Sequence, residues 1–219
     1  MCGRYTITTS PQQLALRFGA SEPAEGLEPR YNAAPSQRLP VITNDHPSEI
    51  ELFRWGLIPF WAKDPKIGYR MINARLETAD SKPSFREAWK KRRCLVLADG
   101  FYEWQKTPDG KVPTRITLHD EEPFAMAGLW ESWHDPEGEE LRTFTILTTE
   151  PNELLAPIHN RMPVILQPDY EREWLSGVTD EVALSELLGP YPADEMAAYP
   201  VSSRVGSPKH DDVGLIVAV

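Results

Sequence analysis

The first five residues, Met1-Cys2-Gly3-Arg4-Tyr5, contain the most reactive combination of groups in this chain. If Met1 is removed, which a small second residue favours, Cys2 carries a free α-amine and a thiol on neighbouring carbons. The pKa of an α-amine is about 7.8 against about 10.4 for lysine, so roughly 14% of it is neutral at pH 7. Such a pair condenses with an aldehyde, first to an imine and then to a thiazolidine. Taken alone, Cys2 is equally consistent with a small buried residue at the start of a strand.

Three polar residues among apolar neighbours could assist this chemistry. Glu103 lies between Tyr102 and Trp104, where strand alternation favours a solvent-facing side chain; a half-buried carboxylate would instead have a raised pKa and could move protons near neutral pH. His159 lies in a predicted loop and suits acid–base work, although a lone histidine is more often structural. Asn73 could orient a reactant by hydrogen bonds or simply close a turn.

The net charge of −10 argues against a nucleic-acid partner, but the charge is unevenly distributed. Residues 1–119 hold 18 Lys and Arg against 13 Asp and Glu, a net charge of +5, whereas residues 120–219 hold 5 against 20, a net charge of −15. Local potential guides a polyanion to its groove, so the N-terminal half remains a candidate for binding one. The acidic half would keep the protein soluble.

A basic, helix-like run from Lys82 to Arg93 follows closely after Arg75. Such a run is usually only a solvated face. Combined with nearby aromatic residues, it could supply phosphate contacts and stacking platforms for a single strand. The aromatic candidates are Trp61, Tyr69 and Trp89.

Length and composition indicate one globular domain of 219 residues, of which 41% are hydrophobic. We find no apolar run near the ~18 residues needed to span a membrane and no secretion signal. The two cysteines, Cys2 and Cys94, suit a reducing cytoplasm better than a disulfide. Zinc-ligand spacing, a P-loop, a dinucleotide fingerprint and a GxSxG elbow are all missing, so we expect no metal and no cofactor.

The sequence pattern predicts an α+β fold with a largely antiparallel sheet and short helices. Ser10 and Pro11 are typical of a helix start, and the apolar run 94–98 of a buried strand. Strands are predicted at 3–8, 41–42, 49–54, 94–98, 112–118, 124–133, 141–148, 164–166, 197–201 and 215–219. Helices are predicted at 11–18, at 86–91 with Ser84 as cap, at 151–157, 170–175 and 180–188. A hairpin turn is expected at 107–110, irregular chain at 31–35 and a surface loop at 60–71.

Several motifs occur together and in order: 1–5, 30–35, 55–59, 72–75, 98–104 and 158–163. Over nearly the whole chain they closely resemble the SOS response-associated peptidase (SRAP) family of abasic-site processing proteins. The resemblance implies a single domain over residues 1–219, with a curved, barrel-like, mainly antiparallel core, short peripheral helices and a positively charged DNA groove.

The resemblance also implies a mechanism. Cys2, exposed by removal of Met1, would capture the ring-opened aldehyde of an abasic site in single-stranded DNA as a thiazolidine, shielding the lesion in the DNA-damage and SOS response. Asn73 would position the N-terminal residue and the sugar, Glu103 would assist proton transfer, and His159 would protonate the ring oxygen. The family's proposed peptidase activity would release Met1, a hydrolase step beside the lyase-type Schiff-base chemistry. The DNA-binding residues would be Arg4, Trp61, Arg75, Lys82, Arg86 and Arg161.

Two positions depart from the family pattern: Asn160 replaces a usual Asp, and Leu97 replaces a common proline. The expected partner is single-stranded DNA containing abasic sites, with no membrane and no metal. We expect a monomer in the cytoplasm, associated with the nucleoid when bound to DNA. The alternative function is an N-terminal-nucleophile glutamine amidotransferase-like hydrolase, which also begins Met-Cys-Gly and attacks an amide with its thiol. A non-covalent single-strand-binding module is a further alternative.

Overall fold

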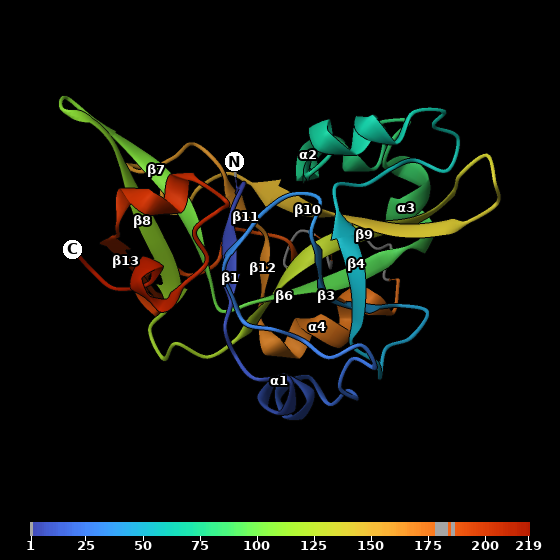
Figure 1. The fold of residues 1–219 in the computed structure, drawn as a ribbon, viewed down its shortest axis with the longest axis horizontal. Helices are drawn as coiled ribbons and strands as arrows, with labels where there is room; N and C mark the ends of the chain where they lie inside the picture. Colours follow the sequence, from blue (N-terminus) through green and yellow to red (C-terminus); the bar gives the residue numbers. More distant parts are fainter. Residues whose placement is uncertain (1, 178–183, 185–186) are drawn as a thin grey trace.

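The backbone is organised around a closed ring of five strands (Figure 1), in a computed structural model that describes residues 2–177, 184 and 187–219. The ring runs from β10 (Glu140–Thr149) to β4 (Glu51–Trp55), β3 (Arg38–Thr43), β6 (Arg93–Ala98), β9 (Phe124–His134) and back to β10. Only the β10–β4 contact in this ring is parallel. Short strands extend it: β5 (Asn73–Arg75) and β11 (Met162–Pro163) pair with β10, and β12 (Ile165–Leu166) pairs with β9.

A second, fully antiparallel sheet contains the start of the chain. Its order is β13 (Met196–Pro200), β8 (Gly110–Leu118), β7 (Gly100–Thr107), β1 (Tyr5–Ile7) and β2 (Arg30–Ala33). Because β1 lies between β7 and β2, the residues just before it are anchored from both sides. One hydrophobic core includes Tyr5 and Phe101 of this sheet together with Leu97 and Phe144 of the closed five-stranded ring, so both sheets belong to one domain.

The helices are short and lie around the two sheets, which confirms the predicted α+β class. The α-helices are α1 (Pro11–Phe18), α2 (Leu76–Ala79), α3 (Arg86–Lys91) and α4 (Pro168–Leu175). The 3-10 helices are η1 (Pro65–Arg70), η2 (Ala193–Glu195), η3 (Ser203–Gly206) and η4 (Val213–Leu215). The predicted start of α1 is confirmed: Ser10 forms a capping box with Gln13, and Gly19 ends the helix with φ of 60°.

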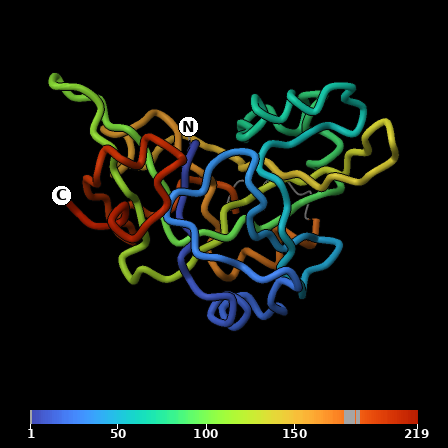
Figure 2. The backbone as a smooth tube through the Cα atoms, in the orientation of Figure 1, coloured from blue at the N-terminus to red at the C-terminus, as the bar shows by residue number. Residues whose placement is uncertain are grey.

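Residues 31–35, predicted to be irregular, include most of β2. The residues around β2 could not predict this strand, because a distant residue of the C-terminal segment stabilises it. The Asp211 carboxylate accepts hydrogen bonds from the backbone amides of Tyr31 and Asn32 at 2.6 and 2.9 Å. The tube in Figure 2 shows this C-terminal segment, in red, lying close to the start of the chain. Its own predicted strand at 215–219 is wrong: η4 ends at Leu215, and one isolated bridge joins Ala218 to Val201.

Two predicted helices also differ. The predicted helix at 151–157 is replaced by turns over residues 153–158, because Pro157 lacks a backbone donor and the Asn152 side chain accepts from Leu155 N at 3.0 Å to close the first turn. The predicted cap Ser84 is wrong, since Phe85 is the N-cap of α3 and makes no side-chain cap bond. Most of the predicted helix at 180–188 lies outside the described residues.

Candidate functional site

Cys2 is fully buried immediately before β1. Its thiol donates a hydrogen bond to the Arg4 carbonyl at 3.6 Å, and its own carbonyl accepts one from Asn73 Nδ2 at 2.8 Å. Asn73 reaches this position because β5 pairs with β10, where Asn73 is in register with Ile146. The structure therefore brings the predicted nucleophile and the predicted orienting amide into direct contact.

Glu103 is buried, with 3% of its surface exposed, so the solvent-facing side chain favoured by alternation is wrong. The reason is that β7 is covered on both faces. Phe101 packs into the main core, while Tyr102 packs on the other side against Val201 and Leu215 of the C-terminal segment. Burial raises the pKa of the Cys2 thiol, and the negative charge of Glu103 raises it further.

His159 completes the group from a fourth segment of the chain. Its Nε2 lies 4.0 Å from Glu103 Oε2, with 28% of the imidazole side chain exposed. The preceding turn holds it, because the His159 backbone amide donates to the Leu155 carbonyl at 2.8 Å. A carboxylate, an imidazole, an amide and a thiol thus converge in an arrangement that suits proton transfer at a reacting carbonyl group.

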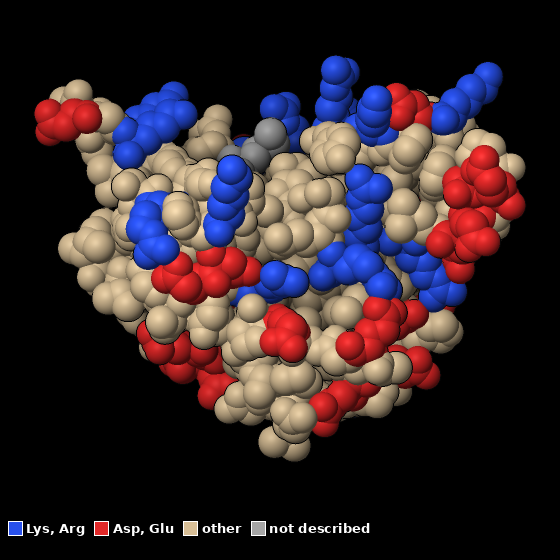
Figure 3. Space-filling model, viewed as in Figure 1, with Lys and Arg blue, Asp and Glu red and all other residues tan. Residues whose placement is uncertain are grey.

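In the view of Figure 1, the chain enters β1 between the β7–β8 hairpin on the left and α2 on the right. The space-filling view in Figure 3 is hollowed at this place, and Lys and Arg gather along the same upper part of the molecule. Asp and Glu gather mainly below and to the side. The surface around the start of the chain is therefore more basic than the total charge of −10 suggests.

Four of the predicted DNA-binding residues present their side chains to solvent. Arg75, Lys82 and Arg86 are exposed, and 48% of the surface of Trp61 is exposed. Arg75 ends β5 two residues after Asn73, so it lies next to the buried site. Tyr69, the second aromatic candidate, is also exposed, with the Arg54 guanidinium 5.7 Å from its ring centroid.

The other two predicted DNA-binding residues are engaged within the protein. Arg4 is partly buried, which lowers its pKa, and it donates to Asn32 Oδ1 at 2.8 Å and to the Val205 carbonyl at 3.0 Å. Arg161 forms a two-pronged ion pair with Glu77 at 2.5 and 2.9 Å. A phosphate at Arg161 would therefore compete with an existing carboxylate, whereas the neutral partners of Arg4 leave its charge in place.

The end of the predicted basic run is structural. Arg93 is 1% exposed, with its guanidinium 4.4 Å from the Trp174 ring centroid, and Trp89 packs edge-on against Trp174 at 5.7 Å. Arg92 forms an ion pair with Glu131 at 2.8 Å. The interpretation of residues 82–93 as one exposed basic face, with Trp89 as a stacking platform, is therefore wrong.

Sequence reasoning missed Asn32 and Glu77. Asn32 is fully buried and connects Arg4 to the C-terminal segment, donating to the carbonyls of Ser207 and His210 at 3.0 and 2.8 Å. A buried asparagine in a strand is a usable signal, because it must satisfy its amide. Glu77 gave no sequence signal, since its partner is distant along the chain.

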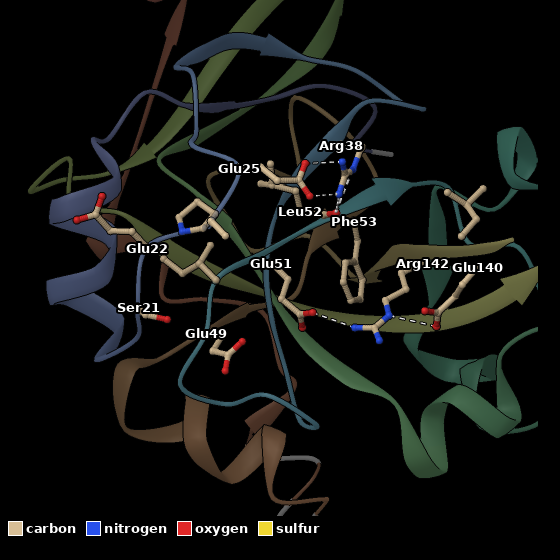
Figure 4. A pocket seen from close by; sticks show the side chains of 14 residues that line it. Ser21, Glu22, Glu25, Arg38, Glu49, Glu51, Leu52, Phe53, Glu140 and Arg142 are labelled. Atoms are coloured by element: carbon tan, nitrogen blue, oxygen red, sulfur yellow. Dashed lines mark hydrogen bonds and ion pairs between the residues drawn. The ribbon is translucent and has the colours of Figure 1, made fainter.

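A second hollow, of about 690 Å³, lies away from these residues, beside β4 and β10 (Figure 4). Both of its arginines are paired with carboxylates: Arg38 with Glu25 at 2.5 Å, and Arg142 with Glu51 at 2.9 Å. Over residues 2–177, 184 and 187–219, no three His, Cys, Asp or Glu side chains are grouped so as to hold a metal ion. No helix in these ranges has the length and apolar character needed to cross a bilayer.

Comparisons with known proteins give an independent line of evidence. The family model described as SOS response associated peptidase (SRAP) matches residues 1–208. The abasic site processing protein YoqW of Bacillus subtilis (strain 168) is 50% identical over 221 residues, which cover 99% of each chain. The abasic site processing protein YedK of Escherichia coli (strain K12) is 33% identical, with 100% of both chains covered. A crystal structure of a protein from Bacteroides thetaiotaomicron is 32% identical and matches with a TM-score of 0.90 over 100% of both chains.

All four converging residues, Cys2, Asn73, Glu103 and His159, lie within the range that the family model matches. The matches at 33% and 50% identity extend over essentially the full length of both chains. The chain therefore belongs to the SOS response-associated peptidase (SRAP) family.

Proposed function

We propose that this protein processes abasic sites by capturing them covalently in single-stranded DNA through Cys2, once Met1 has been removed. Relatives that match over essentially their full length are named abasic site processing proteins, which supports the abasic site as the substrate. The observation that carries the proposal is the meeting of Cys2 with Asn73, Glu103 and His159, because this combination matches the needs of imine chemistry at an aldehyde.

The amine of Cys2 reacts before the thiol in this proposal. Burial and the charge of Glu103 raise the pKa of the thiol, so the sulfur stays protonated near neutral pH. The amine nitrogen adds to the aldehyde carbon, and the carbinolamine then loses water to give an imine. Glu103 carries one proton from nitrogen to the aldehyde oxygen, which completes the carbinolamine, and a second from nitrogen to the hydroxyl, which leaves as water. The thiol sulfur next adds to the imine carbon while its proton passes to nitrogen, which closes the thiazolidine.

Ring opening of the sugar must precede this reaction, because only the open form presents an aldehyde. Opening needs a proton on the ring oxygen and loss of the proton from the anomeric hydroxyl. We assign delivery of the first proton to His159, whose Nε2 lies 4.0 Å from Glu103 and which is the more exposed of the two. The acid and the base for both steps then sit side by side.

We also propose that the same site releases Met1 by hydrolysis, consuming one water and freeing the Cys2 amine. Asn73 supports this step because it holds the Cys2 carbonyl at 2.8 Å, next to the bond that must break. Intact-mass measurement of freshly produced wild type and Asn73→Ala tests it. Retention of Met1 in the variant alone supports the proposal, whereas complete removal in both contradicts it.

We propose that the DNA backbone runs through the basic hollow beside the site. Arg75, Lys82 and Arg86 would contact phosphates from their exposed positions, and Arg4 would meet a phosphate close to Cys2. Trp61 would stack on a base next to the lesion. The two buried thiols, both free, suit a reducing cytoplasm, where the protein would join the nucleoid on binding DNA.

A denaturing gel tests covalent capture directly. Mature protein is mixed with a single-stranded oligonucleotide carrying one abasic site, then heated in detergent. We expect a shifted band with wild type, none with Cys2→Ala, and an undiminished band with Cys94→Ala, which removes the other buried thiol. An oligonucleotide with a tetrahydrofuran analogue, which has no aldehyde, should give no band.

The gel also separates the alternatives. A complex that forms under native conditions but dissolves in detergent with the true abasic site would favour a non-covalent single-strand-binding module. Release of ammonia from glutamine by wild type, lost in Cys2→Ala, would favour the amidotransferase-like hydrolase. Neither result is expected, because a buried thiol beside a carboxylate is poorly placed to attack first as thiolate.

A further inference from the structure

We propose that Glu77 is a positioning residue for His159 and acts through Arg161. Glu77 lies on α2, immediately after the strand that carries Asn73. Its carboxylate holds the Arg161 guanidinium at 2.5 and 2.9 Å, and the same guanidinium donates to the Thr148 carbonyl. The inference rests on the proposed function, in which His159 delivers a proton.

The clamp fixes the backbone of Arg161 as well as its side chain. A planar guanidinium gripped by both carboxylate oxygens and by a β10 carbonyl has little freedom, and only 13% of the Arg161 side chain is exposed. The backbone of Arg161 in turn contacts His159. Nδ1 of His159 lies 3.0 Å from the Arg161 amide nitrogen and 3.2 Å from the Arg161 carbonyl oxygen.

The amide contact selects one form of the imidazole. A neutral imidazole carries hydrogen on one nitrogen and a lone pair on the other. If Nδ1 carried the hydrogen, it would face the N–H of Arg161 at the shorter of the two contacts, and that amide would lose its acceptor. With a lone pair on Nδ1, the amide hydrogen bond forms and the hydrogen of the ring is on Nε2, the nitrogen that lies 4.0 Å from Glu103.

This arrangement links the contact that holds Cys2 to the contact that orients His159. Asn73 and Glu77 belong to one continuous segment, so the segment that holds the Cys2 carbonyl also orients the proton donor. The proposed role of Glu77 also explains why Arg161 is paired with a carboxylate beside the proposed DNA-binding surface. The ion pair fixes the orientation of the His159 imidazole and leaves phosphate contact to the exposed arginines.

Nitrogen NMR of 15N-histidine-labelled protein measures this directly, because Nδ1 and Nε2 have different shifts in each tautomer. The His159 signals are assigned with His159→Ala and recorded where the ring is neutral. In wild type we expect mainly the Nε2–H form. Glu77→Gln weakens the contact that holds Arg161. If that loss is worth one hydrogen bond of ordinary net strength, the ratio of the Nε2–H form to the Nδ1–H form of His159 should fall by about fivefold. The matched control is Glu87→Gln, which removes another exposed carboxylate, paired with Lys91 on α3 at 3.8 Å, and should leave the tautomer unchanged.

Crosslinking rates supply a second readout. Glu77→Gln should slow single-turnover crosslinking in the wild-type background but not in the His159→Ala background, because it acts through that ring. Arg161→Lys, which keeps the charge but lacks the fork, should shift the tautomer in the same direction as Glu77→Gln. An unchanged tautomer in both folded variants, or equal slowing with and without His159, would overturn the proposal. If wild type forms no crosslink, the proposed function fails, while the tautomer measurement still decides this inference.

Discussion

The imidazole of His159 and the carboxylate of Glu103 approach to 4.0 Å, although one side chain is 28% exposed and the other only 3%. One partner is therefore open to solvent protons, whereas the other is shielded beside the Cys2 thiol. Such a pair can divide acid and base roles between two successive steps, because each group meets a different environment.

Asn73 should matter for rate more than for stability. Asn73→Ala removes the hydrogen bond to the Cys2 carbonyl, so the aminothiol loses an orienting contact at a 2.8 Å distance. In protein from which Met1 has been removed, we expect single-turnover crosslinking to slow by roughly threefold to tenfold, as the loss of one ordinary hydrogen bond implies. Asn160→Ala, an exposed amide in the loop after His159, is the matched control. Equal rates for wild type and Asn73→Ala would remove Asn73 from the mechanism.

The Cys2 thiol should be slow to react with alkylating agents. Burial first, and then Glu103, raise its pKa, so near pH 8 less thiolate is present than in an ordinary cysteine. Glu103→Gln removes one of the raising causes, and alkylation of Cys2 by iodoacetamide should become faster. Peptide mapping separates Cys2 from Cys94, whose pKa is raised by burial alone and which serves as internal reference. Slower alkylation of Cys2 in Glu103→Gln would contradict this account.

Binding before crosslinking should be salt-sensitive despite the acidic total charge. For single strands, the logarithm of affinity falls with the logarithm of salt concentration at a slope near −0.7 per neutralised phosphate. Arg75→Ala should make that slope shallower, because Arg75 is exposed beside Asn73. Arg172→Ala on α4 is the matched control, an exposed arginine on a different element. Titration of the Cys2→Ala protein with a labelled oligonucleotide measures both, and identical slopes for the two arginine variants would exclude Arg75 from the interface.

Local signals predicted much of the fold. Ser10 and Pro11 are typical of a helix start, and the apolar run of β6 is typical of a buried strand. Where the decisive partner is distant in sequence, prediction failed. The strand β2 depends on Asp211, and the buried Arg93 depends on Trp174, so neither follows from its own neighbourhood.

The site shows the same division. The residue types of Cys2, Asn73 and His159 allowed chemistry, but each was at least equally consistent with a structural role, and their convergence is a tertiary property. Alternation failed for Glu103 because the face of β7 that it shares with Phe101 packs toward the core and the Cys2–His159 group instead of toward solvent. Glu77 remained invisible because its role depends on an ion pair with Arg161, far along the chain.

Loss of Glu103 and loss of His159 should give different pH profiles for crosslinking. Imine formation needs a deprotonated amine and then expulsion of water, and a carboxylate can carry both protons. Opening the sugar needs a proton on the ring oxygen, which His159 delivers from Nε2, and acid favours that contribution because a charged imidazole is a stronger acid than a neutral one. His159→Ala should therefore slow crosslinking more in acid than in base, whereas Glu103→Gln should slow it throughout. Single-turnover rates between about pH 5.5 and 8.5 for the three proteins measure this, with His46→Ala, a histidine outside the site, as control. Superimposable profiles for the two site variants would show that both act on one step, even if Cys2 remains the nucleophile.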